Sequence, residues 1–77
     1  METIPEITKE IRKKLNMSQE KFGDAIGVTK QTVSLWETGV TTPEFTLLLA
    51  FITNTKDWRR EWALRCYDVH PRKVVVE

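Results

Sequence analysis

The sequence contains little of what catalytic and disulfide-stabilised proteins need. Its 77 residues include one cysteine and one histidine, so no internal disulfide can form. Cys66 and His70 have a spacing that can hold a metal on a helix, but two ligands are too few for a structural zinc site. There is also no glycine-rich phosphate loop and no pair of carboxylates in a plausible pocket. We therefore expect no metal, no cofactor and no enzymatic activity.

Long apolar runs are missing too. No stretch approaches the roughly 18 apolar residues that span a bilayer, and the acidic residues 1–6 lack the basic-then-apolar pattern of a signal peptide. We expect no membrane association and a cytoplasmic location. The length suits one domain, residues 1–77, with a core so small that oligomerisation is a reasonable expectation.

An excess of one charge is the third feature that the sequence lacks. Twelve basic and eleven acidic residues give a net charge of +1. Domains that bind nucleic acid are usually strongly basic, so such a function has to depend on where the charges lie. Opposite charges alternate near the C-terminus, which indicates a solvated, salt-bridged face. These residues are Asp57, Arg59, Arg60, Glu61, Arg65 and Asp68.

What the sequence does have is helical periodicity. Apolar residues recur every three or four positions, and capping residues and glycines divide the chain. The pattern predicts an all-α fold of five helices, at about residues 4–15, 18–26, 29–39, 42–52 and 57–67. The last helix should stop before Pro71, and Val74 to Val76 form either a short β-strand or a ragged tail.

The fourth predicted helix differs from the others in its composition. Thr42 provides an N-cap and Pro43 suits the first helical position. The helix is apolar nearly all round, so we expect it to be the central and most buried helix.

Residues 18–38 form the most informative segment. Gly23 falls inside a predicted helix, where glycine costs about 0.5–1 kcal/mol relative to alanine. That cost makes sense if another helix crosses closely there. Gly27 lies in the turn, where a positive φ is expected. With apolar spacers around both glycines, this pattern predicts a helix-turn-helix. The spacers are Phe22, Ile26, Val28, Val33 and Trp36.

Residues 17–37, MSQEKFGDAIGVTKQTVSLWE, resemble the signature of Cro/C-repressor-type (XRE-like) helix-turn-helix regulators. The resemblance covers roughly residues 11–52. Gly23 replaces the family's usual alanine, Leu35 stands where a polar residue is frequent, and no family pattern matches after Thr53. The resemblance implies a lambda-repressor-like domain that binds double-stranded DNA.

In such a motif the second helix lies in the major groove with its N-terminal end toward the bases. Gln31 can pair with adenine, Lys30 can donate to guanine or phosphate, Ser34 can bond either kind of base, and Leu35 can contact a thymine methyl. The alternative is that these residues form a solvated helix face. The predicted base contacts are Thr29, Lys30, Gln31, Ser34 and Leu35.

The resemblance also implies contacts outside the recognition helix. Gln19 is expected to contact the DNA backbone and to support Gln31. Arg12 and Glu37 match a family ion pair, which we interpret as a structural tie. The predicted phosphate contacts are Asn16, Gln19, Lys21, Thr32, Thr38 and Thr41.

Aromatic residues raise the question of a second copy. Trp36 is expected in the core. Trp58 and Trp62 share one helix face, which either closes the chain's own core or packs against a partner copy. We expect a mixture of the two, with residues 57–77 as the candidate dimerisation region. The predicted dimer interface consists of Trp58, Trp62, Cys66 and Tyr67.

Taken together, these features predict a sequence-specific transcriptional regulator. We expect a small autoregulatory repressor, bacterial or phage-encoded and associated with the nucleoid, that binds an inverted repeat as a homodimer. The alternative is an antitoxin-like interaction module, in which the tryptophan-bearing helix binds a partner protein such as a toxin.

Overall fold

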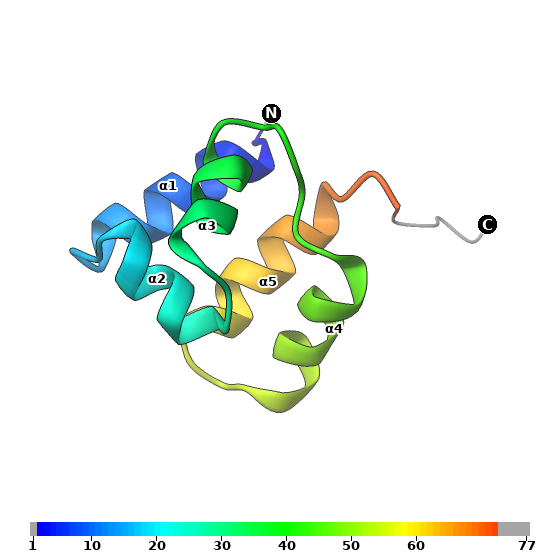
Figure 1. Cartoon of the computed structure of the whole chain (residues 1–77). Helices are drawn as coiled ribbons and strands as arrows, with labels where there is room; N and C mark the ends of the chain where they lie inside the picture. The colour runs from blue at the N-terminus through cyan, green and yellow to red at the C-terminus, as the bar shows by residue number, and fades with distance from the viewer. Residues whose placement is uncertain (1, 73–77) are drawn as a thin grey trace.

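Five α-helices form in the described part of the chain, residues 2–72 of a computed structural model. They are α1 (Ile4–Lys14), α2 (Gln19–Ile26), α3 (Lys30–Glu37), α4 (Phe45–Asn54) and α5 (Trp58–Asp68). Figure 1 shows α5 crossing the middle of the molecule, with α1, α2 and α3 on one side and α4 on the other. The all-α prediction is confirmed. The predicted strand at Val74 to Val76 lies outside the described residues, and no helix within residues 2–72 has the length and apolar character that a bilayer requires.

Side chains cap the N-termini of four of these helices. The hydroxyls of Thr3, Ser18 and Thr29 each accept a hydrogen bond from the backbone N–H three residues later. The Asp57 carboxylate accepts one from the N–H of Arg59. These bonds satisfy backbone donors that a helix N-terminus otherwise leaves unpaired.

The predicted start of α4 is wrong. The helix begins at Phe45, and its N-cap residue, Glu44, makes no capping bond with its side chain. Pro43 therefore lies before the helix instead of in its first turn. Its side chain is fully buried, and its carbonyl oxygen lies 2.8 Å from the imidazole of His70. A tertiary contact thus replaces the expected local cap.

Trp62 of α5 contacts every other helix. Its ring centroid lies 5.7 Å from that of Phe22 in α2, 5.5 Å from that of Trp36 in α3 and 6.3 Å from that of Phe51 in α4. Its indole N–H donates to the hydroxyl of Thr8 in α1 at 3.1 Å. The core is therefore organised around one aromatic side chain, which is fully buried.

The central helix is α5, and the prediction that α4 takes this place is wrong. Trp62, Ala63 and Cys66 are fully buried, whereas Leu48 is the buried residue of α4. α4 packs chiefly against α5, and its other side faces solvent, where Leu49 is 38% exposed. An apolar composition all round the helix did not indicate burial all round.

Two residues of the predicted dimer interface, Trp62 and Cys66, lie inside the fold. Both are fully buried in the chain's own core, so neither is accessible to a second copy. Trp58 and Tyr67 are half-buried. Trp36 lies in the core, as predicted. Burial raises the pKa of the Cys66 thiol to about 12.

Gly23 allows α2 to pack closely against the turn that leads into α3. A Cβ atom at this position would lie 2.6 Å from the carbonyl oxygen of Val28. The predicted close approach is present, but the neighbour is the backbone of the turn and not a crossing helix. Gly27 ends α2 with φ 89°, as predicted, and its N–H donates to the carbonyl of Gly23.

Replacing Gly23 by alanine should destabilise the protein. The new methyl group has to displace backbone in the α2–α3 turn, and overpacking of this kind costs about 1–3 kcal/mol. Chemical denaturation of Gly23→Ala measures the loss. The control is Asp24→Ala, an exposed position in the same helix, which should change the free energy of unfolding by less than about 0.5 kcal/mol. Equal stability of the two variants would contradict the described packing.

Cys66 should resist alkylation in the native protein. With a pKa of about 12, the thiol is ionised in roughly one molecule in 10⁴ at pH 8, against about one in four for an exposed cysteine. Labelling with iodoacetamide should therefore be at least about 100-fold faster in denaturant than in buffer. Because the chain's own core supplies the burial, dilution should not change the native rate. Faster labelling on dilution would show that a second copy covers the thiol.

Candidate nucleic-acid interface

α3 has one buried face and one exposed face. Val33 and Trp36 point into the core. The side chains predicted to contact bases lie on the rest of the surface, where all are exposed except Ser34, which is half-buried. Positions 30, 31, 34 and 35 are neighbours on a helix surface. The structure therefore brings together Lys30, Gln31, Ser34 and Leu35 on one side of α3.

Threonine hydroxyls shape the two ends of α3. The Thr29 hydroxyl caps the helix and lies 3.0 Å from the Thr32 hydroxyl. At the other end, the Thr38 hydroxyl donates to the carbonyl of Ser34 at 3.0 Å. These three residues were predicted to contact DNA, and in the structure their hydroxyls also serve the helix itself.

A bidentate ion pair fixes the C-terminal end of α3. Arg12 of α1 donates from Nε to one oxygen of Glu37 at 2.6 Å and from Nη2 to the other at 2.9 Å. It also donates from Nη1 to the carbonyl of Met17 at 3.0 Å. The Glu37 side chain is 3% exposed, and its hydrogen bonds raise the pKa of Arg12. The structural tie that the sequence predicted is confirmed.

Gln19 joins this tie from the first position of α2. Its side-chain amide donates to Glu37 Oε1 at 3.4 Å. The resemblance implied a contact with Gln31, so the structure gives this amide a different partner. The Glu37 carboxylate thus connects α1, α2 and α3.

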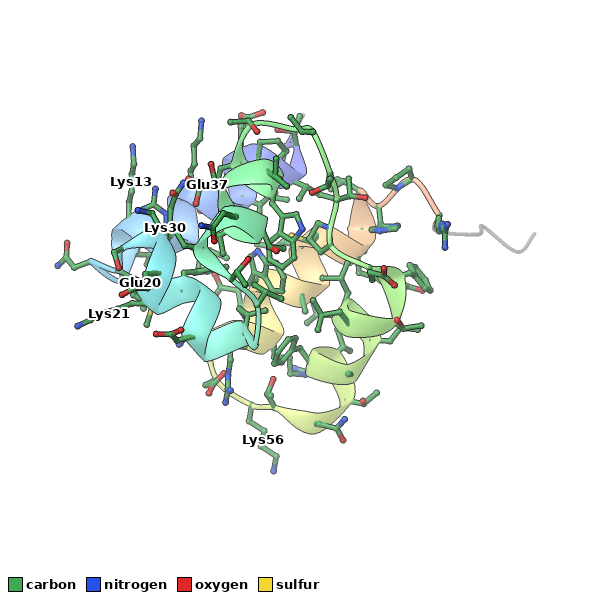
Figure 2. All side chains as sticks on the ribbon, in the orientation of Figure 1. Lys13, Glu20, Lys21, Lys30, Glu37 and Lys56 are labelled. Carbon is green, nitrogen blue, oxygen red and sulfur yellow. The ribbon has the colours of Figure 1, made fainter. Side chains whose placement is uncertain are left out.

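The remaining predicted phosphate contacts lie at the edges of the motif. Asn16 is exposed in the α1–α2 turn with φ 55°, Lys21 is exposed on α2, and Thr41 is exposed after α3. Lys13, which the sequence analysis did not single out, is exposed in the last turn of α1. Figure 2 shows Lys13 and Lys21 projecting from the α1–α2 side of the molecule. In the sequence, the basic run of Arg12, Lys13 and Lys14 indicates this positive charge at the end of α1.

Arg59 and Arg65 of α5 are neutralised within the chain, whereas Arg60 donates to the carbonyl of Ile52. Arg65 forms ion pairs with Glu2 and Glu10 and lies 3.9 Å from Glu61. Hydrogen bonds to Glu10 and Glu2 raise the pKa of Arg65, and the bond from Arg65 lowers the pKa of Glu10. Asp57, the N-cap residue of α5, forms an ion pair with Arg59. The prediction of a salt-bridged face is confirmed, and it extends to α1.

A groove of about 640 Å³ lies between α3 and α4. Trp36 and Leu47 contribute apolar surface to it, and Leu35, which is 40% exposed, lines it from α3. Thr41 and Thr42 border it from the connecting loop. The loop between α3 and α4 therefore lies directly beside the exposed face of α3.

Comparison with known proteins identifies the motif. A family model described as helix-turn-helix matches residues 9–53, more than half of the chain. The chain is 46% identical over 41 residues to YgzD, an uncharacterized HTH-type transcriptional regulator of Bacillus subtilis (strain 168). The aligned segment covers 53% of this chain and 62% of that protein, which is less than two thirds of its length. No solved structure matches the chain significantly.

The family match spans the parts of the structure that define the site. Residues 9–53 include the close α2–α3 turn at Gly23, the tie at Glu37 and the exposed face of α3. The chain belongs to the XRE-like family of helix-turn-helix regulators.

Proposed function

We propose that this chain is a sequence-specific regulator of transcription that binds double-stranded DNA through α3. One observation carries the proposal. The core and the Glu37 tie hold α3 by its buried side, and the same helix leaves Lys30, Gln31 and Leu35 exposed. The relative in B. subtilis is named as an HTH-type transcriptional regulator, which supports the same function.

In this proposal α3 enters the major groove with its N-terminal end toward the bases. Gln31 pairs with adenine, and Lys30 donates to guanine or to a phosphate. Ser34 and Leu35 contact the next base pairs along the helix. Gln19, Lys21 and Asn16, together with the threonines at the two ends of α3, contact the sugar-phosphate backbone, which sets the orientation of α3 on the duplex.

We further propose that two copies bind one operator. The exposed face of α3 reads few base pairs, so a single copy has modest affinity. A homodimer on an inverted repeat would place its recognition helices one DNA turn apart, roughly 34–36 Å. Occupying a promoter, including its own, would then repress transcription sterically. Such a regulator acts at the nucleoid, in the cytoplasm of a bacterium, whether the gene is chromosomal or phage-encoded.

We propose that Trp58 and Tyr67, the half-buried members of the predicted set, belong to the dimer surface. Trp58 packs on Phe22 with centroids 5.3 Å apart, and Tyr67 packs on Phe45 at 5.1 Å. Each can offer a partner copy only the part of its side chain that these contacts leave exposed. Because Trp62 is buried, an α5 that bound a different protein could not present this side chain to it.

Selection from random-sequence duplexes with the full chain tests the proposal. We expect recovery of an inverted repeat, and sedimentation of the complex should give two chains per duplex. Recovery of a single half-site would contradict the proposed homodimer but would still support binding to DNA. No enrichment of any sequence, together with a stable complex with another protein, would reject the proposed function.

Replacing Gln31 by alanine should relax base preference at one base pair of each half-site. Loss of a bidentate contact costs about 1–3 kcal/mol, a factor of roughly 5–150 in affinity for the selected site. Binding to unrelated duplexes should change little. Competition titrations with single-base variants of the selected site measure the effect.

Lys21→Ala is the matched control for Gln31→Ala. Lys21 is proposed to contact phosphate, so its loss should weaken binding to all sequences alike and lower the salt slope by about one per subunit. If both substitutions lower affinity uniformly and leave base preference intact, α3 does not dock as proposed.

A further inference from the structure

We propose that His70, which follows α5, positions the α3–α4 loop for contact with the DNA backbone. The inference rests on the proposed function, because it concerns how the loop beside α3 meets the same duplex. It assigns a role in DNA binding to a residue that lies beyond the segment matched by the family.

The imidazole of His70 is held by both of its nitrogens. His70 is 6% exposed. Its Nδ1 accepts a hydrogen bond from the backbone N–H of Arg72 at 3.0 Å. Because a neutral imidazole carries one proton, Nε2 is the donor, and it lies 2.8 Å from the carbonyl oxygen of Pro43. The ring of Phe45 packs beside it, with centroids 5.4 Å apart.

The bond to Pro43 is one of two anchors of the α3–α4 loop. At the start of the loop, the N–H groups of Val40 and Thr41 donate to the carbonyl of Leu35 at 3.0 and 3.3 Å. At its end, α4 begins without a side-chain cap. His70 supplies there the tie that a capping side chain supplies in the other helices. Thr41 is the last residue of the first anchor and Thr42 lies between the two, and both threonines are exposed.

Threonine hydroxyls and loop N–H groups are ordinary donors to DNA phosphates. They contribute most when the loop is already fixed, because ordering a loose segment on binding costs conformational entropy. Releasing Pro43 should therefore weaken the phosphate contacts of Thr41 and Thr42 and leave base reading by α3 unchanged. If His70 acted only within the core, its replacement would instead lower the free energy of unfolding without changing contacts with particular phosphates.

Two substitutions separate the two hydrogen bonds of His70. Glutamine can place its amide N–H near the position of Nε2, so His70→Gln should keep the bond to Pro43 and bind DNA within about twofold of wild type. Asparagine can replace only the acceptor at Nδ1. His70→Asn should bind about 3–10-fold more weakly, the usual factor for one hydrogen bond, to selected and unrelated duplexes alike.

Phosphate ethylation interference locates the effect on the duplex. Wild type should show interference at the phosphates nearest the α3–α4 loop, Thr41→Ala/Thr42→Ala should lose it, and His70→Asn should lose the same signals and no others. All variants are measured well below their unfolding temperature. Unchanged affinity of His70→Asn, a shift in its base preference, or the absence of loop interference in wild type would overturn the inference. If His70→Asn does not fold, the interference pattern of wild type at the loop phosphates still tests the inference. Wild-type protein that selects no DNA at all would instead reject the proposed function.

Discussion

The contacts of Trp62 are the constraint on which the structure depends. A chain of this size has a marginal core, and here one indole reaches all four other helices. Its near-parallel stacking on Trp36, with 28° between the rings, decides which side of α3 faces inward. Aromatic pairs of this kind contribute about 0.5–1.5 kcal/mol beyond area burial. The exposed face of α3 is thus a consequence of a contact with a helix outside the motif.

Apolar packing alone leaves the position of a short helix loosely specified. The polar tie at Glu37 fixes the position of α3 further. Its carboxylate is 3% exposed, and removing one member of such a pair leaves an uncompensated charge. Bonds from Arg12 and Gln19 satisfy both oxygens from two different helices. The end of α3 is therefore fixed against both α1 and α2. We infer that the pair serves specificity of the fold more than its stability.

Local signals in the sequence predicted local structure well. The caps at Ser18 and Thr29 and the positive φ of Gly27 depend on residues within one turn of each other, so their pattern is visible in the chain. The burial of Trp62 was not predictable in this way. Periodicity shows that a helix has an apolar face, but it does not show whether the chain itself or a second copy covers that face. The same limit produced the error about α4. Pro43 was misassigned because its partner, His70, is 27 residues away.

The distribution of cations explains how a chain of nearly neutral charge can serve the proposed function. Arg12, Arg59 and Arg65 are each paired with carboxylates of the chain. Arg12 and Arg59 each bond one carboxylate in the planar, bidentate geometry to which guanidinium is suited, whereas Arg65 bonds two different carboxylates. Lys21 and Lys30 are exposed. A lysine acts as a mobile point charge and attracts phosphate without demanding one geometry. In the proposed complex, these three arginines therefore contribute to the fold, the exposed lysines contact the DNA backbone, and the amide of Gln31 is the chief group that reads bases. On this proposal, affinity would come mostly from phosphates and depend strongly on salt, whereas specificity would come from a few groups on α3.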